Sequence, residues 1–186
     1  EPIYYSLPNG LSVVLVPDNS SEIASARVIV RAGSIDENKW LGTGVSHYLE
    51  HIVSGGTTKF HSESEYRKKI ANLGGASNAY TTSDHTAYFI NTSSDNLAAA
   101  VQTLYEWMFF CYFSPAEVNR EKGVIHKEME RSDANIYRQF YQLANQNFYK
   151  VHPIQYPVIG YRNLFDKLTR KDIVSYYRQQ YIPSNM

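Results

Sequence analysis

Hydrophobic and polar residues follow two different periods along the chain, and these periods separate strands from helices. β-rich runs that predict strands lie at residues 3–7, 11–17, 26–31, 76–82 and 86–92. The first two flank Pro8-Asn9-Gly10, a strong turn signal, so we expect them to form a β-hairpin. The last two lie on either side of a short turn and are expected to be neighbours in the sheet.

Helical spacing of apolar residues fills most of the remaining chain. It predicts helices at residues 42–53, 62–73, 95–110, 114–149 and 169–180, the fourth with a break near residues 132–133. Three of them begin with capping-box spacing, at Ser62 and Glu65, Ser114 and Glu117, and Thr169 and Asp172. This order of elements predicts an α+β fold with helices packed on one face of a mostly antiparallel sheet. Since no repeat or low-complexity linker divides the chain, we expect residues 1–186 to form one domain.

Composition narrows the class of protein. The 186 residues are 43% hydrophobic, with 18 basic and 18 acidic side chains, which argues against disorder and gives no charge signal for nucleic acid. No run of 18 apolar residues predicts a membrane span. The single cysteine, Cys111, excludes an internal disulfide and a cysteine-rich zinc site and leaves the compartment undetermined. Tyr137, Tyr141 and Tyr149 have roughly helical spacing, which we interpret as a face packed on another layer or domain.

The candidate metal ligands and catalytic base are concentrated in the segment His47-Tyr48-Leu49-Glu50-His51. His47 and His51 are four residues apart, so on a helix they project from one face about one turn apart. This spacing suits two imidazoles on one metal ion, with Glu50 beside the metal as a base rather than a ligand. The alternative is two surface histidines with a solvated glutamate between them, and the spacing favours the metal site.

A third ligand is expected from the fourth helix. Glu121 and Glu128 are seven residues apart and share one face, while Glu130 lies about 200° from Glu128 around the helix. Spacing alone leaves Glu117, Glu121 and Glu128 as candidates, and each could equally be a solvated carboxylate.

Several further segments match a known family in order and spacing. They are residues 7–11 (LPNGL), 31–34 (RAGS), 42–51 (GTGVSHYLEH), 56–57 (GT), 74–75 (GG), 78–82 (NAYTT) with Thr86 and Tyr88, and Glu121 with Glu128. With these motifs the chain resembles the N-terminal, metal-bearing domain of the pitrilysin/insulinase family of zinc metallopeptidases, which includes mitochondrial processing peptidase. His-x-x-Glu-His is the inverted form of the His-Glu-x-x-His zinc motif.

The resemblance implies a role for each candidate residue. It implies one zinc ion held by His47, His51 and Glu128, with Glu121 orienting the site from outside the ligand set and Glu50 as general base. It also implies that an extended peptide adds to the strand at residues 78–82. The substrate-binding residues of that strand are Asn78, Ala79, Tyr80 and Thr81. On physical grounds alone, the same segment is simply a strand entered through a flexible bend.

The implied function is zinc-dependent hydrolysis of peptide bonds in extended or unfolded polypeptides. Members of the family continue after the stretch equivalent to residues 183–186 with another strand and a second domain of similar fold. We therefore expect a truncated N-terminal domain that needs this homologous half, on the same polypeptide or on a partner subunit. Two alternative functions make different demands on the sequence. An S-ribosylhomocysteine lyase would need Cys111 as a ligand and a second, catalytic cysteine, which the chain lacks. A non-catalytic interaction subunit would commonly have lost the metal motif.

Overall fold

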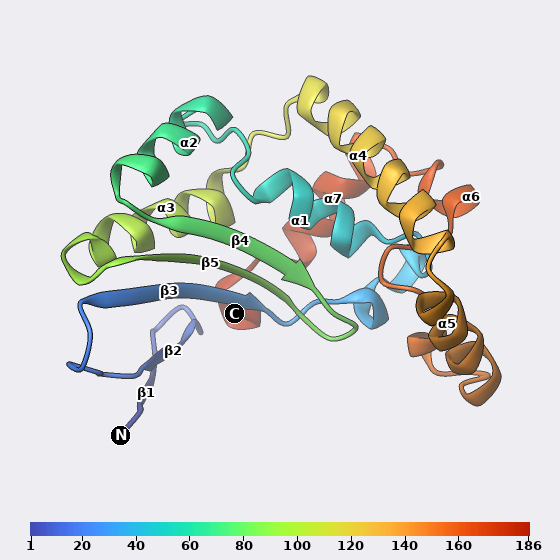
Figure 1. The fold of residues 1–186 in the computed structure, drawn as a ribbon, viewed down its shortest axis with the longest axis horizontal. Coiled ribbons are helices and arrows are strands. Elements are labelled where there is room, and N and C mark those ends of the chain that lie inside the picture. Colours follow the sequence, from blue (N-terminus) through green and yellow to red (C-terminus); the bar gives the residue numbers. More distant parts are fainter.

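The sheet is built as the alternating pattern predicts. The computed structural model describes all 186 residues. Its strands are β1 (Ile3–Ser6), β2 (Ser12–Leu15), β3 (Ile23–Val30), β4 (Ala76–Thr81) and β5 (Thr86–Ser93). β1 and β2 form a separate hairpin, while β3, β5 and β4 form an antiparallel sheet in the order β3-β5-β4 (Figure 1). β4 therefore pairs on one side only and is an edge strand.

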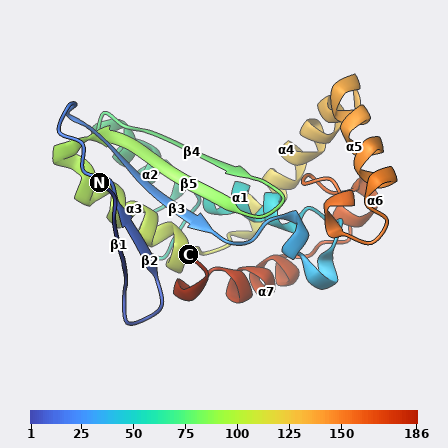
Figure 2. The ribbon, with the colours of Figure 1, turned by 90° about the horizontal axis from the view of Figure 1, so that it is seen from below.

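The helices cover one face of this sheet. They are α1 (Val45–Val53), α2 (Glu63–Asn72), α3 (Leu97–Phe110), α4 (Pro115–Asp133), α5 (Ile136–Phe148), α6 (Arg162–Phe165) and α7 (Arg170–Gln180). α1, α2 and α3 contact the strands, and α4 and α5 extend away from them (Figure 2). Along β3, Ala26 and Val30 are buried beneath the helices while Arg27 and Ile29 face outward. The predicted α+β class and its one-sided helical layer are confirmed.

The two largest differences from the predicted helix boundaries lie at the start of α1 and between α4 and α5. The helix predicted from residue 42 begins at Val45, because Gly42 and Gly44 have φ angles of 79° and 73° that a helix does not accommodate. The helix predicted over residues 114–149 is two helices. They separate at residues 134–135, just after the expected break, where the side chain of Asn135 accepts hydrogen bonds from the first amides of α5.

Two of the three predicted capping boxes form, and the third does not. Ser62 with Glu65 and Thr169 with Asp172 make the reciprocal bonds. Glu117 instead accepts hydrogen bonds from the main-chain nitrogen of Thr57, at 3.1 Å, and from its hydroxyl, at 2.5 Å. The prediction was wrong here because a loop distant in sequence competes for the same carboxylate, and this contact attaches the start of α4 to the loop after α1.

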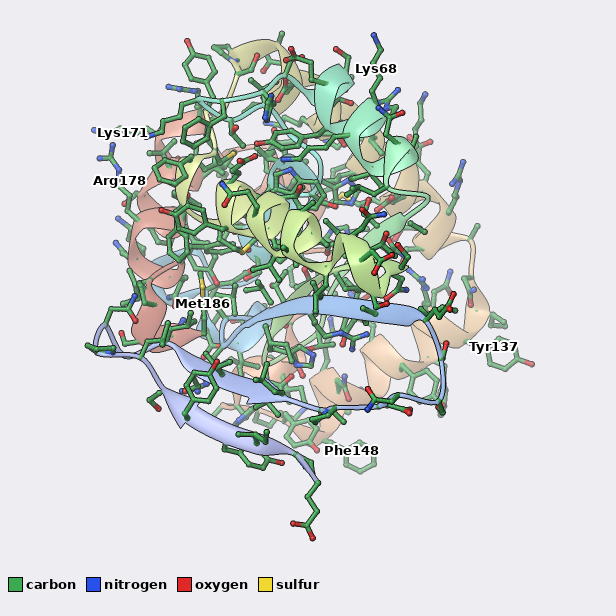
Figure 3. The ribbon with its side chains drawn as sticks, turned by 90° about the vertical axis from the view of Figure 1, so that its left-hand side faces the viewer. Lys68, Tyr137, Phe148, Lys171, Arg178 and Met186 are labelled. Carbon is green, nitrogen blue, oxygen red and sulfur yellow. The ribbon has the colours of Figure 1, made fainter.

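The apolar core lies between the sheet and the helices, and α5 stands largely outside it. Trp107, Tyr48 and Tyr88 are among its largest fully buried side chains. On α5, by contrast, Tyr137 is 75% exposed and Phe148 is 81% exposed, and both project from the surface (Figure 3). The predicted tyrosine face therefore packs on no other layer of this chain, and its packing on another domain stays a prediction. None of the helices combines the length and the apolarity that crossing a bilayer requires.

Candidate metal centre

α1 and α4 bring three possible metal ligands together. The Nε2 atoms of His47 and His51 are 3.3 Å apart, one turn apart on α1. Glu128 Oε2, on α4, lies 3.6 Å from each of them. Four ligands placed tetrahedrally at zinc–ligand distances of about 2.0–2.1 Å would be separated by about 3.3–3.4 Å. The triangle formed by these three atoms therefore has nearly the size of three corners of a tetrahedral zinc site.

Burial sets the charge state of His47. It lowers the pKa of this imidazole to about 3, helped by the nearby charges of His51 and Arg138. The neutral imidazole, which is the form that binds a metal ion, therefore prevails. His47 Nδ1 is buried and has no hydrogen-bond partner, so no contact of this nitrogen within the chain fixes which ring nitrogen carries the proton.

Glu121 lies against the second histidine. Its Oε2 lies 3.3 Å from His51 Nδ1, and its Oε1 accepts a hydrogen bond of 3.0 Å from Arg120 Nε. The hydrogen bond from His51 is the main reason that the pKa of Glu121 falls below its usual value. Burial lowers the pKa of His51, but Glu121, Glu128 and Glu50 outweigh it and raise that pKa overall. A proton on Nδ1, held by Glu121, leaves Nε2 free to face the other two donors.

Glu50 lies beside the triangle without belonging to it. Its side chain is buried, and Oε2 accepts a hydrogen bond of 2.6 Å from the hydroxyl of Thr81 on β4. Burial raises the pKa of Glu50, and the Thr81 hydrogen bond opposes this rise. A carboxylate with a raised pKa, next to a possible metal position, is suited to accept a proton from water.

The free edge of β4 runs next to these groups. A cavity of about 260 Å³ extends from His51, Glu50 and Glu121 to Asn78 and Ala79, so it joins one candidate donor and the Glu50 carboxylate to the expected substrate strand. Tyr80 is 39% exposed. An edge strand has unpaired main-chain groups that can bind a further strand.

The structure separates the remaining candidates from this cluster. Only His47, His51 and Glu128 form a group of three close donors. Among the candidates that spacing left open, Glu117 is bound to Thr57 and Glu121 lies behind His51. Outside the cluster lie Cys111 and the histidines His61, His85, His126 and His152. A metal centre with a cysteine ligand, as a lyase would require, does not form.

One buried carboxylate near the site was not predicted from the sequence. Glu37 is fully buried and accepts hydrogen bonds from Gly44 N and Ser46 N at the start of α1. Burial raises its pKa to about 7. A signal was present in the sequence, because a helix that begins after Gly44 has no side chain at its N-cap and needs an acceptor from elsewhere.

Comparisons with known proteins extend over the whole chain. The model of the family described as Insulinase (Peptidase family M16) matches residues 12–161. A zinc protease PqqE of Helicobacter pylori is 33% identical over an alignment of 187 positions that covers 97% of this chain and 40% of that protein. Mitochondrial-processing peptidase subunit beta of Blastocladiella emersonii is 29% identical over 180 residues, which are 97% of this chain and 38% of that protein. The crystal structure of a protease from Helicobacter pylori matches with a TM-score of 0.93 at 30% identity, over 100% of this chain and 44% of that chain.

Each match covers nearly all of this chain but less than half of the other protein. The chain spans about 40% of the length of the two curated relatives, whereas nearly all of its own residues take part in each match. The family model alone covers most of the chain, including every residue of the candidate metal centre. The chain therefore belongs to the insulinase family of peptidases, peptidase family M16.

Proposed function

We propose that this chain is the metal-bearing domain of a zinc-dependent endopeptidase. His47, His51 and Glu128 would hold one zinc ion. The observation that carries the proposal is the triangle of 3.3, 3.6 and 3.6 Å between their donor atoms, which matches a tetrahedral zinc site with one open position. The name of the Helicobacter pylori relative, a zinc protease, supports the choice of metal.

The residues around the triangle supply the other parts of a hydrolytic mechanism. Zinc in this position would act as a Lewis acid and lower the pKa of a water molecule to about 7. Glu50 accepts the proton of the attacking water and later donates a proton to the amine that leaves. Thr81 holds the Glu50 carboxylate in place, and Glu121 holds His51 in the tautomer that presents Nε2.

The substrate class follows from the strand next to the site. Asn78, Ala79, Tyr80 and Thr81 lie on β4, whose outer edge has no partner strand. An extended or unfolded polypeptide can add to this edge through main-chain hydrogen bonds, without requiring one sequence. The Thr81–Glu50 hydrogen bond connects the edge directly to the base, so a peptide bound there runs past the metal position.

The relatives that this chain matches are more than twice as long as the chain. The chain covers 38–44% of relatives whose sequence or structure it matches along nearly its full length. We propose that residues 1–186 form one N-terminal domain, and that a homologous half completes the active unit. That half belongs to the same polypeptide or to a partner subunit. It would position the substrate. An activated water gives little rate acceleration unless the substrate is held in the right place beside it.

The test combines metal content with activity. Wild-type protein equilibrated with limiting zinc should contain about one zinc per chain, and His51→Ala should lose it. In the complete active unit, Glu50→Gln should keep the metal and lose peptide cleavage, because the amide accepts no proton. Zinc-free wild-type protein, or full activity of Glu50→Gln, would refute the proposal. A chain without zinc that still binds a partner half would instead indicate a non-catalytic interaction subunit.

A further inference from the structure

The first turn of α1 is capped by a residue that lies well before the helix. Gly44 is the N-cap residue, and it has no side chain that could accept hydrogen bonds from the first amides. Glu37 accepts from Gly44 N at 3.3 Å through Oε2 and from Ser46 N at 3.0 Å through Oε1. One distant carboxylate therefore satisfies two of the amides that the start of a helix leaves without a partner.

The local backbone excludes a more ordinary cap. Gly44 has a φ of 73°, and a Cβ at this position would lie 2.3 Å from the carbonyl oxygen of Ile159. Serine, threonine, aspartate and asparagine, which usually cap helices, therefore do not fit there. Glu37 supplies the missing acceptor from outside the helix, and its side chain is fully buried.

Two of the three candidate ligands lie on the helix whose first turn is capped in this way. His47 follows Ser46 directly and His51 lies one turn further along the same helix, so any shift of α1 moves both imidazoles. Glu128 lies on a different helix, α4. The 3.6 Å distances from Glu128 Oε2 to the two Nε2 atoms thus depend on where α1 is held relative to α4.

We infer that Glu37 is a positioning residue for the candidate metal centre, an inference that rests on the function proposed above. Its carboxylate fixes the start of α1 and thereby holds the two imidazoles at the distance from Glu128 that zinc requires. Its hydrogen bonds go to the main chain of Gly44 and Ser46 rather than to a donor atom, so it acts through the helix.

The test compares zinc affinity in the purified full chain, by competition with a chromophoric chelator at pH 8. The variants are Glu37→Gln and, as matched control, Glu106→Gln. The Glu106 carboxylate is also buried and hydrogen-bonded, to a tyrosine and a glutamine, but lies on α3 outside the donor cluster. We expect zinc binding to be roughly tenfold weaker in Glu37→Gln and unchanged in Glu106→Gln. Hydrogen exchange should show lost protection of the Gly44 and Ser46 amides only in Glu37→Gln.

Several results would overturn the inference. One is wild-type zinc affinity in folded Glu37→Gln, and another is an equal loss in both variants, which would indicate general loosening. If Glu37→Gln does not fold, Glu37→Asp replaces it, with the same charge on a shorter side chain. Wild-type affinity of that variant, despite unprotected Gly44 and Ser46 amides, would also overturn it. Wild-type protein that binds no zinc would refute the proposed function and this inference with it.

Discussion

Glu37 gives the metal-free protein a pH dependence whose sign follows from its burial. Burial raises the pKa of this carboxyl from 4.5 to about 7, against hydrogen bonds from Ser46 and Gly44 that lower it. The unfolded chain therefore releases the proton near pH 4.5, and the folded chain keeps it until near pH 7. The stabilisation from protonated Glu37 is complete below pH 4.5 and is lost as the pH rises through 7. At about 1.4 kcal/mol per pKa unit, the loss amounts to about 3 kcal/mol.

The assay is the difference in free energy of unfolding between wild-type protein and Glu37→Gln, measured by urea denaturation with chelator present. From pH 4.5 to pH 8 this difference should shift by about 3 kcal/mol in favour of the variant. His47 has the opposite slope, because burial lowers its pKa to about 3, but it is present in both proteins and cancels. A difference that is constant over this range, or that shifts in favour of the wild type, would refute the reasoning.

Three further changes test other contacts. Glu121→Gln should weaken zinc binding by about 10–100-fold, because a neutral amide holds His51 less firmly; an unchanged dissociation constant would contradict this role. Thr81→Val removes the hydrogen bond that lowers the pKa of Glu50, so the acidic limb of the kcat/KM profile should move to higher pH. An unmoved limb would argue against Glu50 as the base. Gly44→Ala should destabilise the fold by at least about 1–2 kcal/mol, because its φ is 73°, and an unchanged Tm would disprove this.

The elements that local sequence determines were predicted well. Strands with one buried face show period-two alternation, as in β3, and helices with nearby capping partners, as at Ser62 and Thr169, begin where expected. The errors arose where the local signal was overridden. Gly42 and Gly44 interrupt an apolar pattern that looks helical from residue 42, and the loop at Thr57 takes the Glu117 carboxylate from its predicted cap.

Part of the candidate site could also be predicted from local sequence, and part could not. Two histidines four residues apart are visible in the sequence because one helix turn brings them together. Spacing could not choose among three glutamates of α4, because that choice depends on how α4 packs against α1. The contacts of Glu37 with Ser46 and of Glu50 with Thr81 join separate elements, the second across 31 residues. No periodicity within one element encodes such pairs, so only the folded structure reveals them.

These long-range contacts converge on one short helix. Glu37 holds the start of α1, the hydroxyl of Tyr48 donates to the carbonyl of Val118 on α4 at 2.6 Å, and Glu50 accepts from Thr81 on β4. The candidate base and two of the three candidate ligands are therefore parts of one helix. These three contacts hold it, together with the Ser46 hydroxyl, which hydrogen-bonds with the Gly33 carbonyl and the Tyr176 hydroxyl. Loosening one of these contacts would shift the two imidazoles and Glu50 together, and this shift would strain the other contacts of the helix. Substitutions at two of these contacts should thus change zinc affinity by more than the product of their separate effects, as expected for residues coupled through a shared backbone shift.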